Sequence, residues 1–195
     1  MTVRKLGMPG MYIELEVRDR SGKLIRKYRQ PARTWVKNFM ILLYGGLTDT
    51  TTHPIKTDGG TSNIQSTVEY GEILKVTAPA GDDQYGLVVG KGTKPYDPND
   101  YCLDNQIANG TGADQLSYGE VTVEEPIDTG TKLVMRIIRI FTNNSGGNIT
   151  VTEVGLIMFC SNVHILVARD VLAQAVTVPD GSTLTARYIL EVAYA

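Results

Sequence analysis

The stretch that decides the fold is KLVMRIIRIFTNNSGGNITVTEVGLIMF, residues 132–159. Its first part, 132–142, is rich in β-branched residues, and Leu133, Met135 and Ile137 share one face of an extended chain, with Arg139 next in the series. The segment 143–147 has the composition of a tight turn, and apolar residues dominate again at 149–159. The stretch predicts two long antiparallel strands joined by a hairpin turn.

The same alternation of strands and turns extends over most of the chain. Ile13, Leu15 and Val17 share one face of a strand expected at 11–20, which a short turn connects to a second strand at 24–28. Further strands are expected at 71–79, 85–90, 116–125, 163–168, 176–178 and 184–194. This pattern predicts a mainly β protein, an antiparallel β-sandwich or jelly-roll-like domain with one N-terminal helix.

The segment 34–47 is the exception, because its apolar residues follow helical spacing. Trp35, Phe39 and Leu43 belong to a broad apolar stripe that must be buried over much of its circumference. A polar, turn-rich loop follows at 48–66. We therefore divide the chain into an attachment segment of hairpin, helix and loop at 1–66 and a β-sandwich domain at 67–195. Either the helix and loop lock to neighbouring chains, or the helix plugs one end of the sandwich.

Composition and charge exclude several classes of function. The 195 residues are 42% hydrophobic and 21% charged, with a net charge of −2, so no bulk field attracts nucleic acid or anionic lipid. The N-terminal residues do not resemble a secretory signal, and no apolar run is long enough to span a membrane. The two cysteines, Cys102 and Cys160, are expected to be buried thiols.

No motif in the chain predicts catalysis or a cofactor. Gly90–Pro95 resembles a phosphate-binding loop, but its spacing is wrong and the prolines that follow prevent a helix. The cluster of Asp97, Asn99, Asp100 and Asp104 offers oxygen ligands for calcium, although turns around Pro98 explain it equally well. The two histidines, His53 and His164, have no neighbours at metal-ligand spacing. We expect a protein that is not an enzyme and needs no cofactor or small-molecule substrate.

The remaining charged residues suggest surfaces rather than a reaction centre. Arg136 and Arg139 are expected to be strand-surface charges, and Arg169-Asp170 to tie a strand end to a neighbouring turn. The N-terminal hairpin is basic, and we expect its outward face to carry most of these charges, Arg18 and Arg26 among them. We do not expect nucleic acid as a partner, because the hairpin has few interleaved aromatic residues. The basic residues are Arg18, Arg20, Lys23, Arg26, Lys27, Arg29 and Arg33.

The second half of the chain contains a series of recognisable turn and strand motifs. They include Thr152-Glu-Val-Gly-Leu156 and the ending Val178-Pro-Asp-Gly-Ser-Thr-Leu-Thr-Ala-Arg-Tyr188. This series, over residues 86–195, resembles β-sandwich decoration, tail and fibre-attachment proteins of tailed bacteriophages and related viruses. The other segments that carry the resemblance are 86–95, 99–103, 110–118, 139–147 and 168–171.

The resemblance implies assembly rather than catalysis. The expected function is that of a virion structural protein, preferably a capsid decoration or minor head protein, located in the virion after assembly in the host cytoplasm. Its expected partners are copies of itself and other virion proteins of the capsid or tail. A tail, neck or baseplate adaptor is the alternative within this class. A carbohydrate-binding β-sandwich of a fibre is the alternative from another class, with exposed Tyr96 and Tyr101 as its candidate contacts.

Overall fold

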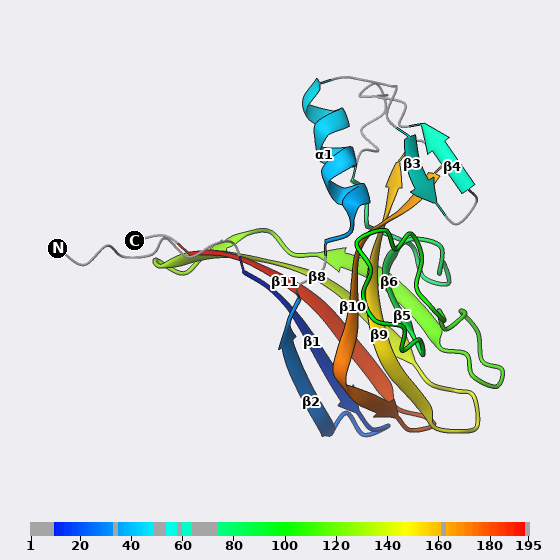
Figure 1. The fold of residues 1–195 in the computed structure, drawn as a ribbon. Coiled ribbons are helices and arrows are strands. Elements are labelled where there is room, and N and C mark those ends of the chain that lie inside the picture. Colours follow the sequence, from blue (N-terminus) through cyan, green and yellow to red (C-terminus); the bar gives the residue numbers. More distant parts are fainter. Residues whose placement is uncertain are drawn as a thin grey trace.

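Two antiparallel sheets, packed face to face, form the body of the molecule (Figure 1). The computed structural model describes residues 10–32, 35–48, 54–57, 60–63, 74–160 and 163–193, with the backbone alone described at 43–48, 54–56 and 61–63. The predicted mainly β, antiparallel sandwich with one helix is confirmed. The larger sheet has the strand order β2 (Leu24–Pro31), β1 (Gly10–Arg18), β11 (Thr183–Ala193), β8 (Lys132–Thr142) and β6 (Ser117–Val123). The short strand β7 (Ile127–Asp128) also pairs with β8. The smaller sheet has the strand order β10 (Val163–Val178), β9 (Ile149–Cys160) and β5 (Gly86–Gly90).

The N-terminal hairpin continues the larger sheet. Strand β1 pairs along its length with β11, and Ile13, Leu15 and Val17 lie opposite Tyr188, Ala186 and Leu184. All six of these side chains are fully buried against the smaller sheet, as their alternation in the sequence predicts. Residues 10–31 therefore share one hydrophobic core with the strands of residues 117–193.

Helix α1 (Lys37–Thr48) and a short hairpin of β3 (Pro54–Thr57) and β4 (Gly60–Asn63) lie beside one another at one end of the smaller sheet (Figure 1). The helix was expected at 34–47 and begins at Lys37, and Thr34, the first residue of the expected range, lies outside the described residues. Part of the expected loop 48–66 is this hairpin. Both α1 and β3 contact β10.

Three strand predictions differ from the structure. The expected strands at 163–168 and 176–178 are one 16-residue strand, β10, whose pairing with β9 is interrupted by two register shifts. Residues 74–79, the described part of the strand expected at 71–79, form only an isolated bridge from Lys75 to Phe159. Leu133 was expected on the buried face of its strand but is exposed, because β8 extends past the smaller sheet there (Figure 1).

Two turns at one end of the sandwich are held together by hydrogen bonds, several of them from the buried residue Asn143. Asn143 donates its side-chain amide to Gly147 O at 2.8 Å and to Val178 O at 2.7 Å. In the partner turn, Asp180 accepts a hydrogen bond from the Gly146 amide at 2.9 Å. The turns after β8 and β10 are therefore one hydrogen-bonded unit, which fixes the position of the larger sheet relative to the smaller one.

An irregular segment between β5 and β6 forms a third layer over the smaller sheet (Figure 1). Leu103, Ile107 and Leu116 from this segment are buried in the common core. Backbone hydrogen bonds from Lys91 to Asn105 and from Ile107 to Val89 tie it along β5. Of the segments that carry the viral resemblance, 86–95, 99–103, 152–156 and 168–171 meet at the junction of this layer with β9 and β10.

Candidate functional site

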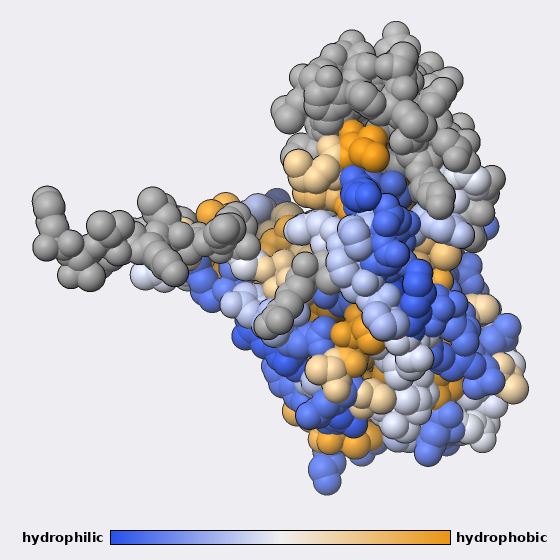
Figure 2. Space-filling model, in the orientation of Figure 1, coloured by the Kyte–Doolittle hydropathy of each residue, from blue (hydrophilic) through white to orange (hydrophobic). Residues whose placement is uncertain are grey.

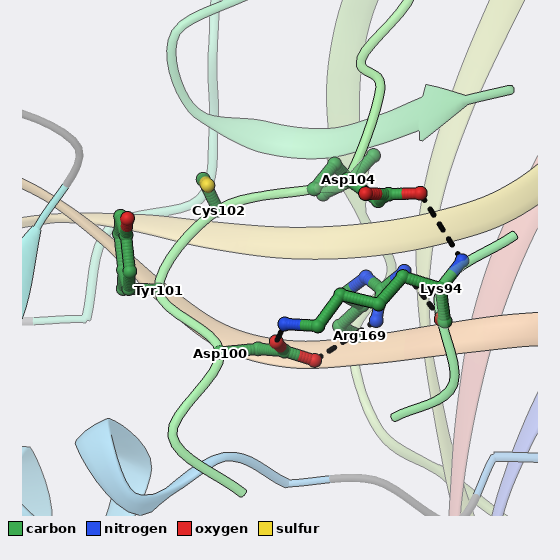
Figure 3. A pocket seen from close by; sticks show the side chains of 7 residues that line it. Lys94, Asp100, Tyr101, Cys102, Asp104 and Arg169 are labelled. Atoms are coloured by element: carbon green, nitrogen blue, oxygen red, sulfur yellow. Dashed lines mark hydrogen bonds and ion pairs between the residues drawn. The ribbon is translucent and has the colours of Figure 1, made fainter. Parts of the chain in front are cut away.

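A buried cluster of charged residues joins the third layer to the smaller sheet. Arg169 on β10 donates from Nε to Glu153 Oε2 on β9 at 2.9 Å, and from Nη1 to Asp100 Oδ2 at 2.9 Å. Its Nη2 donates to the Lys94 carbonyl at 3.0 Å, and Lys94 Nζ is 2.8 Å from Asp100 Oδ1. Figure 3 shows the Arg169 and Lys94 side chains converging on Asp100. We call these four residues the ion cluster.

The carboxylate of Glu153 is the centre of the ion cluster. Besides Arg169, it accepts hydrogen bonds from the backbone amides of Gly92 at 3.0 Å, Asn105 at 2.8 Å and Asp104 at 3.1 Å. A side chain at Gly92 would overlap Glu153, and the same holds at Gly90. The segment that resembles a phosphate-binding loop thus contributes one backbone amide, that of Gly92, to the binding of an anion, and that anion is the chain's own carboxylate.

Charge pairing explains the ionisation of the cluster. Burial alone raises the pKa of Asp100, but hydrogen bonds from Lys94 and Arg169 outweigh burial and hold the pKa below its ordinary value. Burial lowers the pKa of Arg169, and its two carboxylate partners reverse that effect and raise it. Asp100 and Arg169 are therefore both charged at neutral pH. Arg169-Asp170 was expected to tie a strand end to a turn. Arg169 instead lies in the middle of β10, and from there it holds the segment 91–105 of the third layer.

Gly155 forms a second close contact between the third layer and the smaller sheet. Its Cα faces the side chain of Leu103, and an added Cβ would overlap Leu103 Cδ1. Leu103 is buried and belongs to the third layer. In the Thr-Glu-Val-Gly-Leu motif, the threonine hydroxyl also donates to the Gly92 carbonyl at 2.8 Å. The polar and glycine positions of the motif therefore all serve to hold the third layer on β9.

Substituting Gly155 with alanine tests this contact. We expect Gly155→Ala to lower the free energy of unfolding by roughly 1–3 kcal/mol, because the methyl group overpacks the junction. Urea denaturation followed by fluorescence measures the change. The double variant Gly155→Ala/Leu103→Ala removes the overlapping side chain, so it should be less unstable than the sum of the two single variants predicts. Additive losses would show that Leu103 is not what the methyl group meets.

A shallow cavity of about 140 Å³ opens beside the ion cluster (Figure 3). Its wall includes Tyr101 and Cys102 together with charged side chains of the cluster and Asp104. Asp104 Oδ2 accepts hydrogen bonds from the amides of Thr93 and Lys94, at 3.0 and 3.1 Å. In the part of the chain that the structure describes, no three His, Cys, Asp or Glu side chains are grouped to hold a metal ion. The aspartates of the proposed calcium cluster form turns and ion pairs instead.

The helix and the third layer meet through predicted interaction residues. Tyr96 donates its hydroxyl to the Trp35 carbonyl at 3.0 Å, and the Trp35 and Phe39 rings stack with centroids 4.0 Å apart. Lys37, the first residue of α1, donates its amide to Pro98 O at 2.9 Å. The structure thus brings Trp35, Phe39 and Tyr96 together. Tyr101 lies nearby in the cavity wall, and the side chain of Leu43 lies outside the described part.

The basic hairpin carries an ion-pair lattice rather than one uniformly basic face. Lys27 Nζ is 3.0 Å from both Glu14 and Glu16 on the neighbouring strand, and Arg18 is 3.5 Å from Glu16. Arg26 lies opposite Val17, on the face that is directed toward the smaller sheet. The prediction that Arg26 shares an outward face with Lys27 is wrong, because successive residues of a strand point to opposite faces.

Arg139 is the largest departure from the expected pattern of surface charges. It is fully buried between the sheets. Its Nε donates to Gly119 O at 2.8 Å, its Nη1 to Tyr85 O and Leu87 O at 3.1 and 3.2 Å, and its Nη2 to Pro79 O and Asp82 O. All five guanidinium N–H groups are therefore used by backbone carbonyls. Burial lowers the pKa of Arg139, which indicates the cost of placing the charge there.

The other residues with reactive or metal-binding side chains take part in packing or lie outside the described residues. His53 lies outside the described residues. His164 stacks on Tyr85 with ring centroids 5.8 Å apart, and Cys102 and Cys160 are both thiols, the first half-buried and the second buried. Tyr188 donates to Asp170 at 3.4 Å between the sheets, and burial raises its pKa well above the ordinary value.

Comparisons with protein-family models, with curated proteins and with solved structures found no significant match to this chain. Among the described residues, no helix has the length and apolarity required to cross a bilayer.

Proposed function

We propose that the chain is a virion structural protein, preferably a capsid decoration or minor head protein, which assembles with copies of itself and with other particle proteins. A tail, neck or baseplate adaptor is the alternative position in the particle. The motifs that carry the viral resemblance support a structural role, because their polar residues are used to hold layers and turns together. The same residues offer no set of convergent groups for a reaction on a substrate.

The observation that carries this proposal is an end of the larger sheet that the other described residues leave exposed. Leu133 and Val192 are paired neighbours on β8 and β11, and they continue the face that farther along the strands forms the core. Here they extend past the smaller sheet and are 39% and 47% exposed (Figure 1). We call Leu133 and Val192 the sheet end.

An apolar sheet face without a covering layer is typical of a surface that is buried on assembly. On the face of the body that Figure 2 shows, hydrophobic residues reach the surface among hydrophilic ones. On the opposite face of the same strands, Lys132 and Glu191 form an ion pair of 2.9 Å. A partner with an apolar strand or helix face would bury the sheet end and leave this ion pair in solvent.

The experiment is to purify particles from the infected host on a density gradient and to follow the chain by mass spectrometry. We expect the chain to sediment with the particles, and Leu133→Glu/Val192→Glu to reduce the bound fraction at least tenfold because two charges would be buried. Ile140→Glu is the matched control, since Ile140 is an exposed residue of the same strand away from the sheet end. Wild-type chain found only in the soluble fractions would contradict the proposal. Neighbouring portal and major capsid genes would favour the head, and tube or tape-measure genes the tail.

A second candidate function is carbohydrate binding, favoured by the cavity beside Tyr101. Tyr96 and Tyr101 are each 37% exposed, and aromatic faces beside polar side chains are suited to stack on sugar rings. The hydroxyl of Tyr96 is already bonded to Trp35, so Tyr101 would be the main contact. Glycan-array binding that is lost in Tyr101→Ala and in Tyr96→Ala would support this function. An array without signal above background would exclude it.

A further inference from the structure

The two edges of the larger sheet carry opposite charge. One edge is β2 with the residue before it, and residues 23–31 contain four basic and no acidic residues. They are Lys23, Arg26, Lys27 and Arg29. Lys27 and Arg29 alternate along the solvent face of the strand, where about half of each side chain remains exposed. We call residues 23–31 the basic edge.

The opposite edge is formed by the end of β6, by β7 and by the residues between them. Residues 120–128 contain four acidic and no basic residues: Glu120, Glu124, Glu125 and Asp128. Residues 78–81 cover the start of β6 through hydrogen bonds from Val121 N to Ala78 O and from Gly81 N to Tyr118 O. The stretch after these contacts is the outermost strand of the described sheet on this side. We call residues 120–128 the acidic edge.

Each edge also exposes two apolar side chains among its charges. On the basic edge these are Leu24 and Ile25, and on the acidic edge Val123 and Ile127. A partner strand laid against either edge would therefore bury apolar surface and place its charges beside those of the edge. Two basic edges or two acidic edges would bring like charges together, which disfavours pairing. A basic edge beside an acidic edge is favoured on both counts.

We infer that copies of this chain associate head to tail, with the basic edge of one copy beside the acidic edge of the next. This inference deepens the proposed assembly function and rests on it for its biological setting. Because the two edges are different surfaces on opposite sides of the sheet, each copy keeps one edge open after pairing. Such heterologous contacts produce either a closed ring or an open filament.

Charged edges also have a simpler explanation. Lysine and proline on an edge strand protect it against pairing with any other strand, and Pro31 and Pro126 lie on these two edges. That explanation predicts a chain that stays monomeric, whichever charges its edges carry. Head-to-tail association instead predicts that complementary edges attract one another and that equal edges do not. The two explanations differ in a measurable way.

The test uses two variants that each disable one edge. Lys23→Glu/Arg26→Glu brings the basic edge from +4 to zero, and Glu120→Lys/Glu125→Lys brings the acidic edge from −4 to zero. Among the described residues, none of these four forms an ion pair that the substitution would break. Asn144→Lys/Asn148→Lys, at the exposed turn between β8 and β9, is the control for added charge. Circular dichroism and thermal melting verify that every variant is folded.

Sedimentation velocity at low salt supplies the readout. We expect wild type and the control to exceed the monomer mass of 21.3 kDa increasingly with concentration, and to dissociate when salt screens the charges. Each edge variant alone should remain monomeric. An equal mixture of the two has one complementary contact per pair, so it should form dimers and nothing larger. Monomeric wild type at low salt, or a mixture that stays monomeric, would overturn the inference while leaving particle binding, tested through the sheet end, unaffected.

Discussion

Arg139→Met is expected to lower the free energy of unfolding by about 4 kcal/mol, the largest effect of any single substitution considered for this chain. The five carbonyl groups that accept from the guanidinium belong to residues 79–87 and to Gly119. Methionine fills a similar volume but donates no hydrogen bond, so these carbonyls would be buried without a donor. Relief from burying a charge offsets part of the loss. The guanidinium also lies 4.6 Å from the Tyr118 ring centroid, and this contact would be lost as well.

Urea denaturation of the variant measures this loss, and Arg136→Met is the matched control. Arg136 lies on the same strand, but it is about one-third exposed and makes one ion pair with Glu124. Its replacement should cost less than about 1 kcal/mol. Arg139→Lys keeps the charge without the planar array of five donors, so we expect it to be nearly as unstable as the methionine variant. If Arg139→Met lost no more than Arg136→Met, the carbonyls would have found other donors and the structural role of Arg139 would be wrong.

Glu153→Gln is expected to lower the free energy of unfolding by about 3 kcal/mol and to loosen residues 91–105. Glutamine matches the shape of glutamate, but one carboxylate oxygen becomes an amide that donates. The new amide would face two donors in either orientation: Arg169 Nε and the Asp104 amide at the Oε2 position, or the Gly92 and Asn105 amides at the Oε1 position. Arg169 would also keep only Asp100 as a carboxylate partner in the ion cluster. The loss is thus concentrated where the third layer meets the smaller sheet.

Hydrogen exchange resolves the local part of this effect. The amides of Gly92, Asp104 and Asn105 donate to Glu153 and should lose protection before the strands of the larger sheet do. Glu120→Gln, an exposed glutamate outside the ion cluster, is the control and should leave exchange unchanged. Uniform loss of protection across both sheets would show that Glu153 acts on the whole fold rather than on the third layer.

The strands of the sandwich could be predicted because their alternation reports burial directly. Ile13, Leu15 and Val17 are an example, since a half-buried strand needs a period of two residues. The sequence predicts two strands where the structure has the single strand β10. The reason is that residues 173–175 are exposed at the register shift, and their sequence pattern resembles that of a loop. The helix could be placed to within three residues at its start, since apolar spacing locates a helix better than it locates its first turn.

The ion cluster and the role of Arg139 could not be predicted in this way. An arginine in a strand pattern is expected at the surface, and only the carbonyls of residues 79–87, distant in the sequence, make its burial possible. The sequence marks Glu153 only as part of a motif, although the glycines around its site are a further signal. A regular strand does not require the glycines at positions 90, 92 and 155. Each of them makes room for a side chain where the third layer meets the smaller sheet.

Strand β1 has a neighbour that is made much later than β1 itself. Its partner β11 begins 165 residues after the end of β1. At ribosomal rates of about 5–20 residues per second, that interval lasts roughly 8 to 33 seconds. During this time the hairpin of β1 and β2 would present the β11-facing side of β1 to solvent. The alternating Glu14, Glu16, Lys27 and Arg29 keep one face of the waiting hairpin well hydrated, which lowers its risk of aggregating with other nascent chains.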